Sequence, residues 1–144
     1  MSACFDANDL KTVVDLTGRL LESEDRFVCG CVERNPVYKR TNQIRGIWLM
    51  ENERYFQWLT FRPLLPSFPL RVELEHCQFD IALFRERQKE PVALGEMKVW
   101  RSAKGEEEIP DIQADIQKLA REQCAQFLLI FTLSPRGETD KNVG

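Results

Sequence analysis

Apolar positions three and four residues apart open the chain, which is the spacing of one face of a helix. They are Leu10, Val13, Val14, Leu20 and Leu21. This spacing predicts a helix over residues 8–24, capped by Asp6 or Asn8. Residues 25–40 are expected to have mixed structure, with breaks at Gly30, Asn35 and Pro36.

A second apolar stripe predicts a helix over residues 42–61. Its positions are Ile44, Ile47, Trp48, Tyr55, Trp58 and Leu59. The segment PLLPSFP follows. Its three prolines are expected to end the helix, because proline has no amide hydrogen and its ring clashes with the preceding turn.

The spacing changes to alternation in the segment LRVELEHCQFDIALF. Leu70, Val72 and Leu74 alternate with charged residues, which predicts a half-buried strand, and FDIALF predicts a second strand. A short turn at Cys77 and Gln78 joins them, so a hairpin is expected. After a charged loop, VALGEMKVW predicts a third strand.

The last third of the chain predicts one helix and one strand. The helix starts near Pro110, because proline suits the first helical turn. The run QFLLIFTL is typical of a strand buried on both faces, and residues 134–144 predict a frayed tail. The order helix, helix, three strands, helix, strand predicts one α/β domain over residues 1–144, with a small mixed sheet flanked by helices.

Composition is that of an ordinary globular domain, with 43% hydrophobic and 30% charged residues. The net charge of −3 and the pI near 5.3 lack the basic footprint of a nucleic-acid coat protein. An acidic pI is still compatible with an enzyme that acts on nucleic acid, because catalytic carboxylates lower the pI. Five cysteines without a secretory signal predict reduced thiols in a cytoplasmic protein. The apolar runs are too short to span a bilayer, so no membrane partner is expected.

The chain has a single histidine, His76, so many classes of enzyme that depend on histidine are not expected. A Ser-His-Asp triad would have to use it, and the sequence contains no GxSxG, P-loop or GxGxxG segment. Cys29 and Cys31 form only a CxC pair, which is a weak signal for zinc. Any catalytic chemistry is therefore expected to involve carboxylates, lysine and a bound metal.

Carboxylates gather where the second and third predicted strands are neighbours. Asp80 lies in FDIALF, and Glu96 and Lys98 lie in LGEMKVW, where strand alternation puts both on one face. With a two-residue hairpin turn, Glu75 falls opposite Asp80. Such crowding is unfavourable unless a cation is bound, and oxygen ligands of this kind suit Mg²⁺ or Mn²⁺.

Each of these residues has a physical role in such a site. Asp80 and Glu96 are expected to hold the metal, with the Met97 carbonyl and Glu75 as further ligands. The metal would lower the pKa of a bound water. Lys98 would orient or activate the nucleophile, or stabilise the charge that develops on a phosphate.

The segments FDIALF, LGEMKVW, IPDIQADIQKL and QFLLIFTL together resemble the PD-(D/E)XK nuclease superfamily. The resemblance covers residues 42–133, and Phe79 stands where the family name has proline. It implies a restriction-endonuclease-like core of order helix-strand-strand-strand-helix-strand, here with an extra N-terminal helix. It also implies a metal-dependent nuclease that hydrolyses phosphodiester bonds, with DNA as the expected substrate and with Asp80, Glu96 and Lys98 as catalytic residues.

Members of that family often add a glutamate from the helix before the motif and a glutamine from the helix after it. On a helical wheel Glu51 falls within the apolar stripe and Glu53 falls nearly opposite, which favours Glu51. For the glutamine the resemblance implies Gln113, with Gln117 one turn further on the same face.

Other interpretations remain open. Glu96 and Lys98 can be a surface ion pair worth about 0–1 kcal/mol, and Glu75 and Gln113 can be solvated residues. The protein can also be an inactive nuclease-fold member that binds nucleic acid or another protein. The sequence leaves open DNA or RNA, and endonuclease or exonuclease action. Because a chain of this size has little room for a recognition domain, a homodimer or a partner protein is expected to supply specificity.

Overall fold

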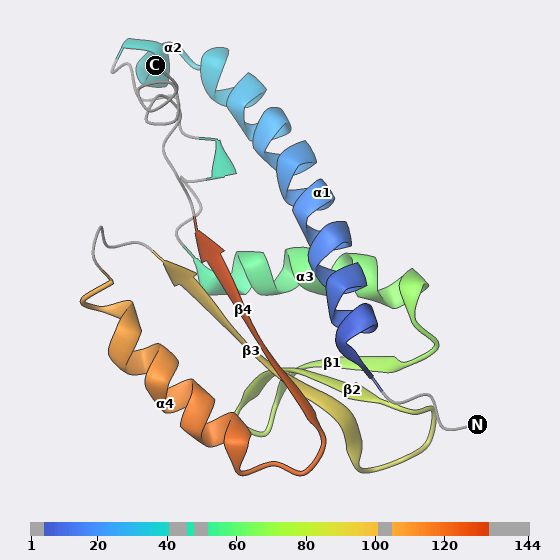
Figure 1. The fold of residues 1–144 in the computed structure, drawn as a ribbon. Coiled ribbons are helices and arrows are strands. Elements are labelled where there is room, and N and C mark those ends of the chain that lie inside the picture. Colours follow the sequence, from blue (N-terminus) through green and yellow to red (C-terminus); the bar gives the residue numbers. More distant parts are fainter. Residues whose placement is uncertain (1–4, 41–45, 48–51, 101–104, 133–144) are drawn as a thin grey trace.

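The computed structural model describes residues 5–40, 46–47, 52–100 and 105–132. Its elements in chain order are α1 (Ala7–Glu33), α2 (Pro36–Arg40), α3 (Glu53–Ser67), β1 (Arg71–His76), β2 (Phe79–Phe84), β3 (Pro91–Trp100), α4 (Glu108–Ala120) and β4 (Ala125–Thr132) (Figure 1). This order confirms the predicted α/β class. Among these residues no helix has both the length and the apolar character that crossing a bilayer requires.

The strands form one mixed sheet in the order β1-β2-β3-β4. β1 and β2 form the predicted hairpin around Cys77 and Gln78, and β3 continues the antiparallel pairing. β4 runs parallel to β3, which is possible because α4 carries the chain back to the other end of the sheet. β2 and β3 therefore lie in the centre of the sheet.

Helices cover both faces of this sheet (Figure 1). On one face, α1 and α3 share an apolar cluster that contains Met97 of β3. On the other face, Leu119 of α4 packs in a cluster with Leu94 of β3. Because side chains alternate along a strand, Glu96 and Lys98 share the face of Leu94 and point toward α4.

α1 is longer than the apolar spacing predicts. It ends at Glu33 and α2 follows, so the break expected at Gly30 is wrong and the break expected at Asn35 and Pro36 is confirmed. A glycine inside a helix costs only about 1 kcal/mol, and the burial of Cys29 before it and of Val32 after it continues the apolar face through this position. Asp6 is confirmed as the cap, because its side chain accepts the amide hydrogen of Asp9 at 2.9 Å.

α3 also differs from the prediction. In the described part of the chain it begins at Glu53 and continues past two prolines to Ser67, so the expectation that the prolines end the helix is wrong. An interior proline costs about 3 kcal/mol. Leu64, which is fully buried in the core, stabilises the same turn and offsets this cost. The predicted positions 42–45 and 48–51 lie outside the described residues.

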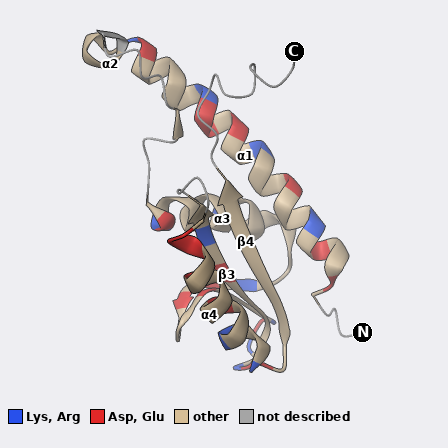
Figure 2. Cartoon of the chain, turned by 60° about the vertical axis from the view of Figure 1, so that its left-hand side comes forward, with Lys and Arg blue, Asp and Glu red and all other residues tan. Residues whose placement is uncertain are grey.

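β4 is an edge strand that buries one face only. Phe127, Leu129 and Phe131 are buried, but Ile130 is 44% exposed, so the prediction of burial on both faces is wrong. The reason is that α4 covers this face only in part, because Leu128 packs against the cluster that contains Leu119 whereas Ile130 stays in contact with solvent. Figure 2 shows β4 without charged residues, whereas acidic and basic residues alternate along α1. The predicted tail over residues 134–144 lies outside the described residues.

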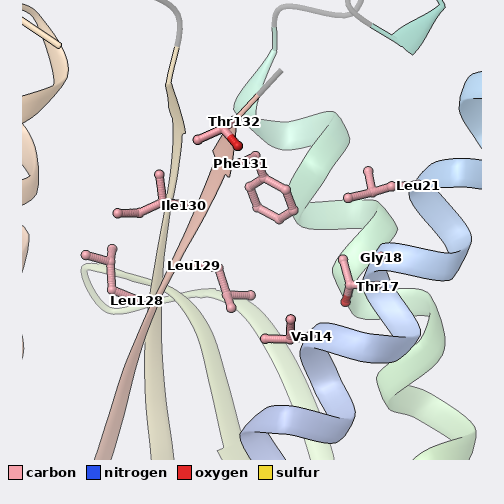
Figure 3. A pocket seen from close by; sticks show the side chains of 9 residues that line it. All are labelled: Val14, Thr17, Gly18, Leu21, Leu128, Leu129, Ile130, Phe131 and Thr132. Atoms are coloured by element: carbon pink, nitrogen blue, oxygen red, sulfur yellow. The ribbon is translucent and has the colours of Figure 1, made fainter. Parts of the chain in front are cut away.

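A pocket of about 360 Å³ lies between α1 and β4 (Figure 3). The side chains of Leu129 and Phe131 point into it from β4, and Val14 and Leu21 point into it from α1. Its lining contains no ionisable side chain. The pocket therefore offers no acid, base or charged ligand, and the candidate chemistry lies elsewhere.

Gly95 occupies the position before Glu96 because the sheet leaves no room for a side chain there. It pairs with Phe127 of β4, and a Cβ atom on Gly95 would overlap the Phe127 ring. The glycine therefore lets an aromatic ring pack directly on β3 beside the predicted carboxylate site.

Candidate active site

Asp80 and Glu96 lie directly beyond the last paired residues of β2 and β3. Asp80 Oδ2 accepts the amide hydrogen of Met97 at 2.8 Å. Gln57 of α3 donates through Nε2 to the Asp80 carbonyl oxygen at 2.7 Å. The backbone and the carboxylate of Asp80 are therefore both fixed, one by α3 and the other by β3.

Glu96 is a buried carboxyl group with 4% of its surface exposed. It is hydrogen-bonded to the carboxyl group of Asp80, and the Lys118 ammonium group pairs with its Oε1. Burial raises the pKa of Glu96 to about 8; Lys118 opposes this rise, and the hydrogen bond and charge of Asp80 add to it. Asp80 and Glu96 are therefore a crowded pair that favours a proton or a cation between their oxygens.

Lys118 of α4 is a site residue that the sequence interpretation missed. Besides its ion pair with Glu96, Nζ donates to the carbonyl oxygen of Gln78 at 2.6 Å. It also lies 5.1 Å from the centroid of the Phe79 ring. Lys118 therefore links α4 to the turn of the β1–β2 hairpin and supplies positive charge at Glu96.

Lys98 lies between the two helices on either side of the site. Its Nζ is 3.4 Å from Glu53 Oε1 in α3 and 3.0 Å from Asp111 Oδ2 in α4. Burial alone would lower the pKa of Lys98, but the hydrogen bond to Asp111 and the charges of Glu53 and Asp111 raise it above its ordinary value. Lys98 therefore stays protonated at neutral pH.

A small cavity of about 110 Å³ opens beside Asp80. Its lining consists of Glu53, Arg54, Gln57, Glu75, Asp80 and Met97. Glu75 reaches it from β1, where its φ of 56° marks an irregular strand position. The pairs Leu74–Ile81 and His76–Phe79 enclose Glu75 and Asp80, as the two-residue turn predicts. The exposed carboxylate of Glu75 therefore lies at the rim of the site.

The face of α4 toward the sheet carries Asp111, Asp115 and Lys118, which are one helical turn apart. Burial raises the pKa of Asp115, against the opposing charges of Lys118 and Lys98. Gln113 and Gln117 are exposed, and at about 100° per residue Gln113 lies about 200° around the helix from Asp111. The structure therefore does not bring Gln113 to the site. The spacing of Asp111, Asp115 and Lys118 was the signal that could have identified this face.

Of the two helix glutamates, the structure brings Glu53 to the site, through its ion pair with Lys98 and its place in the cavity lining. Glu51 lies outside the described residues. The helical wheel disfavoured Glu53 because it counted Trp58 in the buried stripe, and this is wrong because Trp58 is 50% exposed. In the structure α3 begins at Glu53 and buries Phe56, Thr60 and Leu64, so Glu53 lies in the first turn at the end of the buried face.

Negative charge exceeds positive charge in this region. The carboxylates are Glu53, Asp80, Glu96, Asp111 and Asp115, and the ammonium groups are Lys98 and Lys118. In the part of the chain that the structure describes, no group of three or more His, Cys, Asp or Glu side chains is arranged to hold a metal ion. The pair Asp80 and Glu96 still fits Mg²⁺, which commonly binds one or two carboxylates and completes its shell with water and phosphate.

The protein is thus an α/β protein with a carboxyl pair and two lysines at the centre of a mixed sheet. No protein-family model, no curated protein and no solved structure matches the chain. A function for the protein must therefore be inferred from the chemistry of Asp80, Glu96, Lys98 and Lys118.

Proposed function

We propose that the protein is a metal-dependent nuclease of the PD-(D/E)XK type, with DNA as its substrate. The observation that carries this proposal is the contact between the carboxyl groups of Asp80 and Glu96, with Lys98 two residues further along β3. The element order from α3 to β4 also agrees with a restriction-endonuclease-like core. α1 is then an addition at the N-terminal side.

The carboxyl pair is the part of the site that would hold the cation. Asp80 and Glu96 are its first ligands, and the Met97 carbonyl and Glu75 are further candidates. When bound, Mg²⁺ or Mn²⁺ supplies a water of lowered pKa and offsets charge on the phosphate. Because Met97 and Gln57 fix Asp80 in place, little reorganisation of that ligand is needed.

Lys98 has an electrostatic role in this proposal. Its ammonium group is held by Glu53 and Asp111, which keep it charged, so Lys98 does not act as a general base. Lys98 pairs with Glu53, which lines the cavity beside Asp80, so its fixed positive charge would stabilise the negative charge that develops on phosphodiester oxygens bound there.

A calorimetric titration with Mn²⁺ tests the proposed ligands. The wild-type protein is expected to bind Mn²⁺, and Asp80→Asn is expected to bind it at least about 10-fold more weakly, because a charged ligand is lost. Glu86→Gln, in the exposed loop after β2, is the matched control and should bind like wild type. Equal affinity of wild type and Asp80→Asn would place the cation elsewhere and contradict the proposal.

One observation favours a second function. The ammonium group of Lys118 already lies at Glu96, in the place that a bound cation would take. An inactive nuclease-fold protein that binds nucleic acid or a protein needs no metal at this pair. In that case the titration shows no heat of Mn²⁺ binding in any variant.

A further inference from the structure

α3 carries a narrow stripe of exposed apolar side chains that begins one helical turn after Arg54, a residue that lines the cavity beside Asp80. Trp58 is 50% exposed and Leu65 is 51% exposed, and the Phe61 ring lies between them along the helix. The rings of Trp58 and Phe61 are stacked, with centroids 5.5 Å apart and an interplanar angle of 23°. Phe61 therefore holds the Trp58 ring in a fixed orientation while half of Trp58 stays in contact with solvent.

We propose that Trp58, supported by Phe61, is a stacking platform for an unpaired base of a nucleic-acid strand. The inference rests on the proposed function, because it takes the same strand to the carboxyl pair. Exposed aromatic rings bind successive bases without sequence preference, because every base has a flat π-face. The substrate class is then single-stranded nucleic acid, or the frayed end of a duplex.

The position of Trp58 along α3 suits this role. Arg54 and Trp58 are four residues apart, which is about 6 Å along the helix axis and about 40° around it. Stacked nucleotides advance by about 3.4 Å each along a strand. A base on Trp58 would therefore be about two nucleotides away from a phosphate held by Arg54, which lines the cavity beside Asp80.

Arginines lie one helical turn before and one helical turn after Trp58. Arg54 is exposed one turn before Trp58 and lines the same cavity as Asp80. Arg62 lies one turn after Trp58, is 45% exposed in its side chain and pairs with Glu24 of α1 at 3.4 Å. Guanidinium groups on either side of an aromatic ring complement a strand whose bases stack and whose phosphates carry negative charge.

A protein partner is the competing occupant of this stripe. A specific protein interface covers about 800 Å² on each partner. The exposed apolar side chains of α3 form a row only one helix face wide, with arginines beside it. The geometry and the charge therefore favour a strand of nucleic acid.

Fluorescence polarisation with a labelled oligothymidylate tests the platform in a buffer that contains EDTA, so that no cutting occurs. Wild type is expected to bind the single strand at least about 5-fold more tightly than a blunt duplex. Trp58→Ala should weaken single-strand binding about 5- to 150-fold and remove the preference. Trp58→Phe, which keeps a smaller ring, should lose less. Phe27→Ala, at a 67% exposed aromatic residue of α1, is the matched control and should bind within about twofold of wild type.

The outcomes separate this inference from the proposed function. If Trp58→Ala and wild type bind the single strand equally, and Mg²⁺-dependent cutting persists, the platform is wrong and the nuclease stands. If Trp58→Ala changes the sedimentation of the protein but not its affinity for the oligonucleotide, the stripe is a protein interface. If wild type binds no single strand in EDTA but cuts DNA with Mg²⁺, the platform is wrong and the nuclease stands. If wild type neither binds nor cuts any nucleic acid, both proposals fail.

Discussion

The ammonium group of Lys118 in α4 pairs with the buried carboxyl group of Glu96 in β3. The contact joins residues that are far apart in the sequence and places a positive charge at the centre of an acidic site. The effect of Lys118 on the stability of the protein can therefore be measured separately from any effect on catalysis.

Lys118→Met keeps most of the apolar stem and removes the charge. Above about pH 8, Glu96 is ionised, and the variant leaves this buried carboxylate without its partner. Because Lys118 is partly exposed, we expect a loss of about 1–3 kcal/mol in the free energy of unfolding at about pH 9. Urea unfolding measures this loss. Adding Glu96→Gln to Lys118→Met should recover most of it, and an equal loss at about pH 6 and pH 9 would mean that Lys118 does not compensate the charge of Glu96.

Stability without a divalent cation should depend on pH through Glu96. Its pKa is about 8 in the folded protein against an ordinary value of 4.5, so the native state keeps a proton that the unfolded chain releases. The stabilisation is complete below about pH 4.5 and is lost as the pH rises to about 8. Urea unfolding in EDTA across this range should show a falling free energy of unfolding for wild type. Glu96→Gln, which cannot titrate, should show a weaker slope, and an unchanged slope would contradict the assignment.

Gly95→Ala should destabilise the protein, because the new Cβ atom overlaps the Phe127 ring. We expect a loss of about 1–3 kcal/mol in the free energy of unfolding. Gly18→Ala is the matched control: Gly18 lies in α1 with open space around it, so the change should stabilise the helix by about 0.5–1 kcal/mol. Thermal melts of both variants decide this, and a neutral Gly95→Ala would show that the ring is free to move.

Glu53 should contribute to cation binding more than Glu51 does. Glu53 lines the cavity beside Asp80 and orients Lys98. Glu53→Gln is therefore expected to weaken Mn²⁺ binding about 10-fold, because it removes a negative charge from the cavity that the proposed ligand Asp80 lines. Calorimetry of Glu53→Gln and Glu51→Gln compares them. A larger effect of Glu51→Gln would contradict this expectation and would favour Glu51 as the site residue, as the helical wheel predicted.

The part of the site made by neighbouring strands followed from the sequence. The turn at Cys77 and Gln78 fixes the register of the hairpin, and strand alternation then puts Glu96 and Lys98 on one face. The contact of Asp80 with Glu96 needs only that β2 and β3 be adjacent, which a short loop between them makes the expected arrangement. Local rules were sufficient for these residues.

The contribution of the helices did not follow from the sequence. Lys118 reaches Glu96 from α4, and this depends on the angle at which that helix crosses the sheet. Gln113 lies on the same helix but on its exposed side. The prolines of α3 led to a wrong prediction of its end for a similar reason. The buried Leu64 stabilises a helical turn that local propensity alone disfavours. Packing between elements decides such cases, and a single sequence contains little information about it.

Cutting of supercoiled plasmid by wild type and Lys98→Ala tests the nuclease proposal most directly. With Mg²⁺ we expect wild type to nick or cut the plasmid, and we expect EDTA to stop it. Lys98→Ala should cut at least about 100-fold more slowly while it binds Mn²⁺ like wild type, because in the proposed mechanism Lys98 acts on the phosphate and not on the cation. Lys89→Ala, in the exposed loop before β3, should cut at the wild-type rate. Equal cutting by wild type and Lys98→Ala, or no cutting of any nucleic acid together with no binding of Mn²⁺, would contradict the proposal.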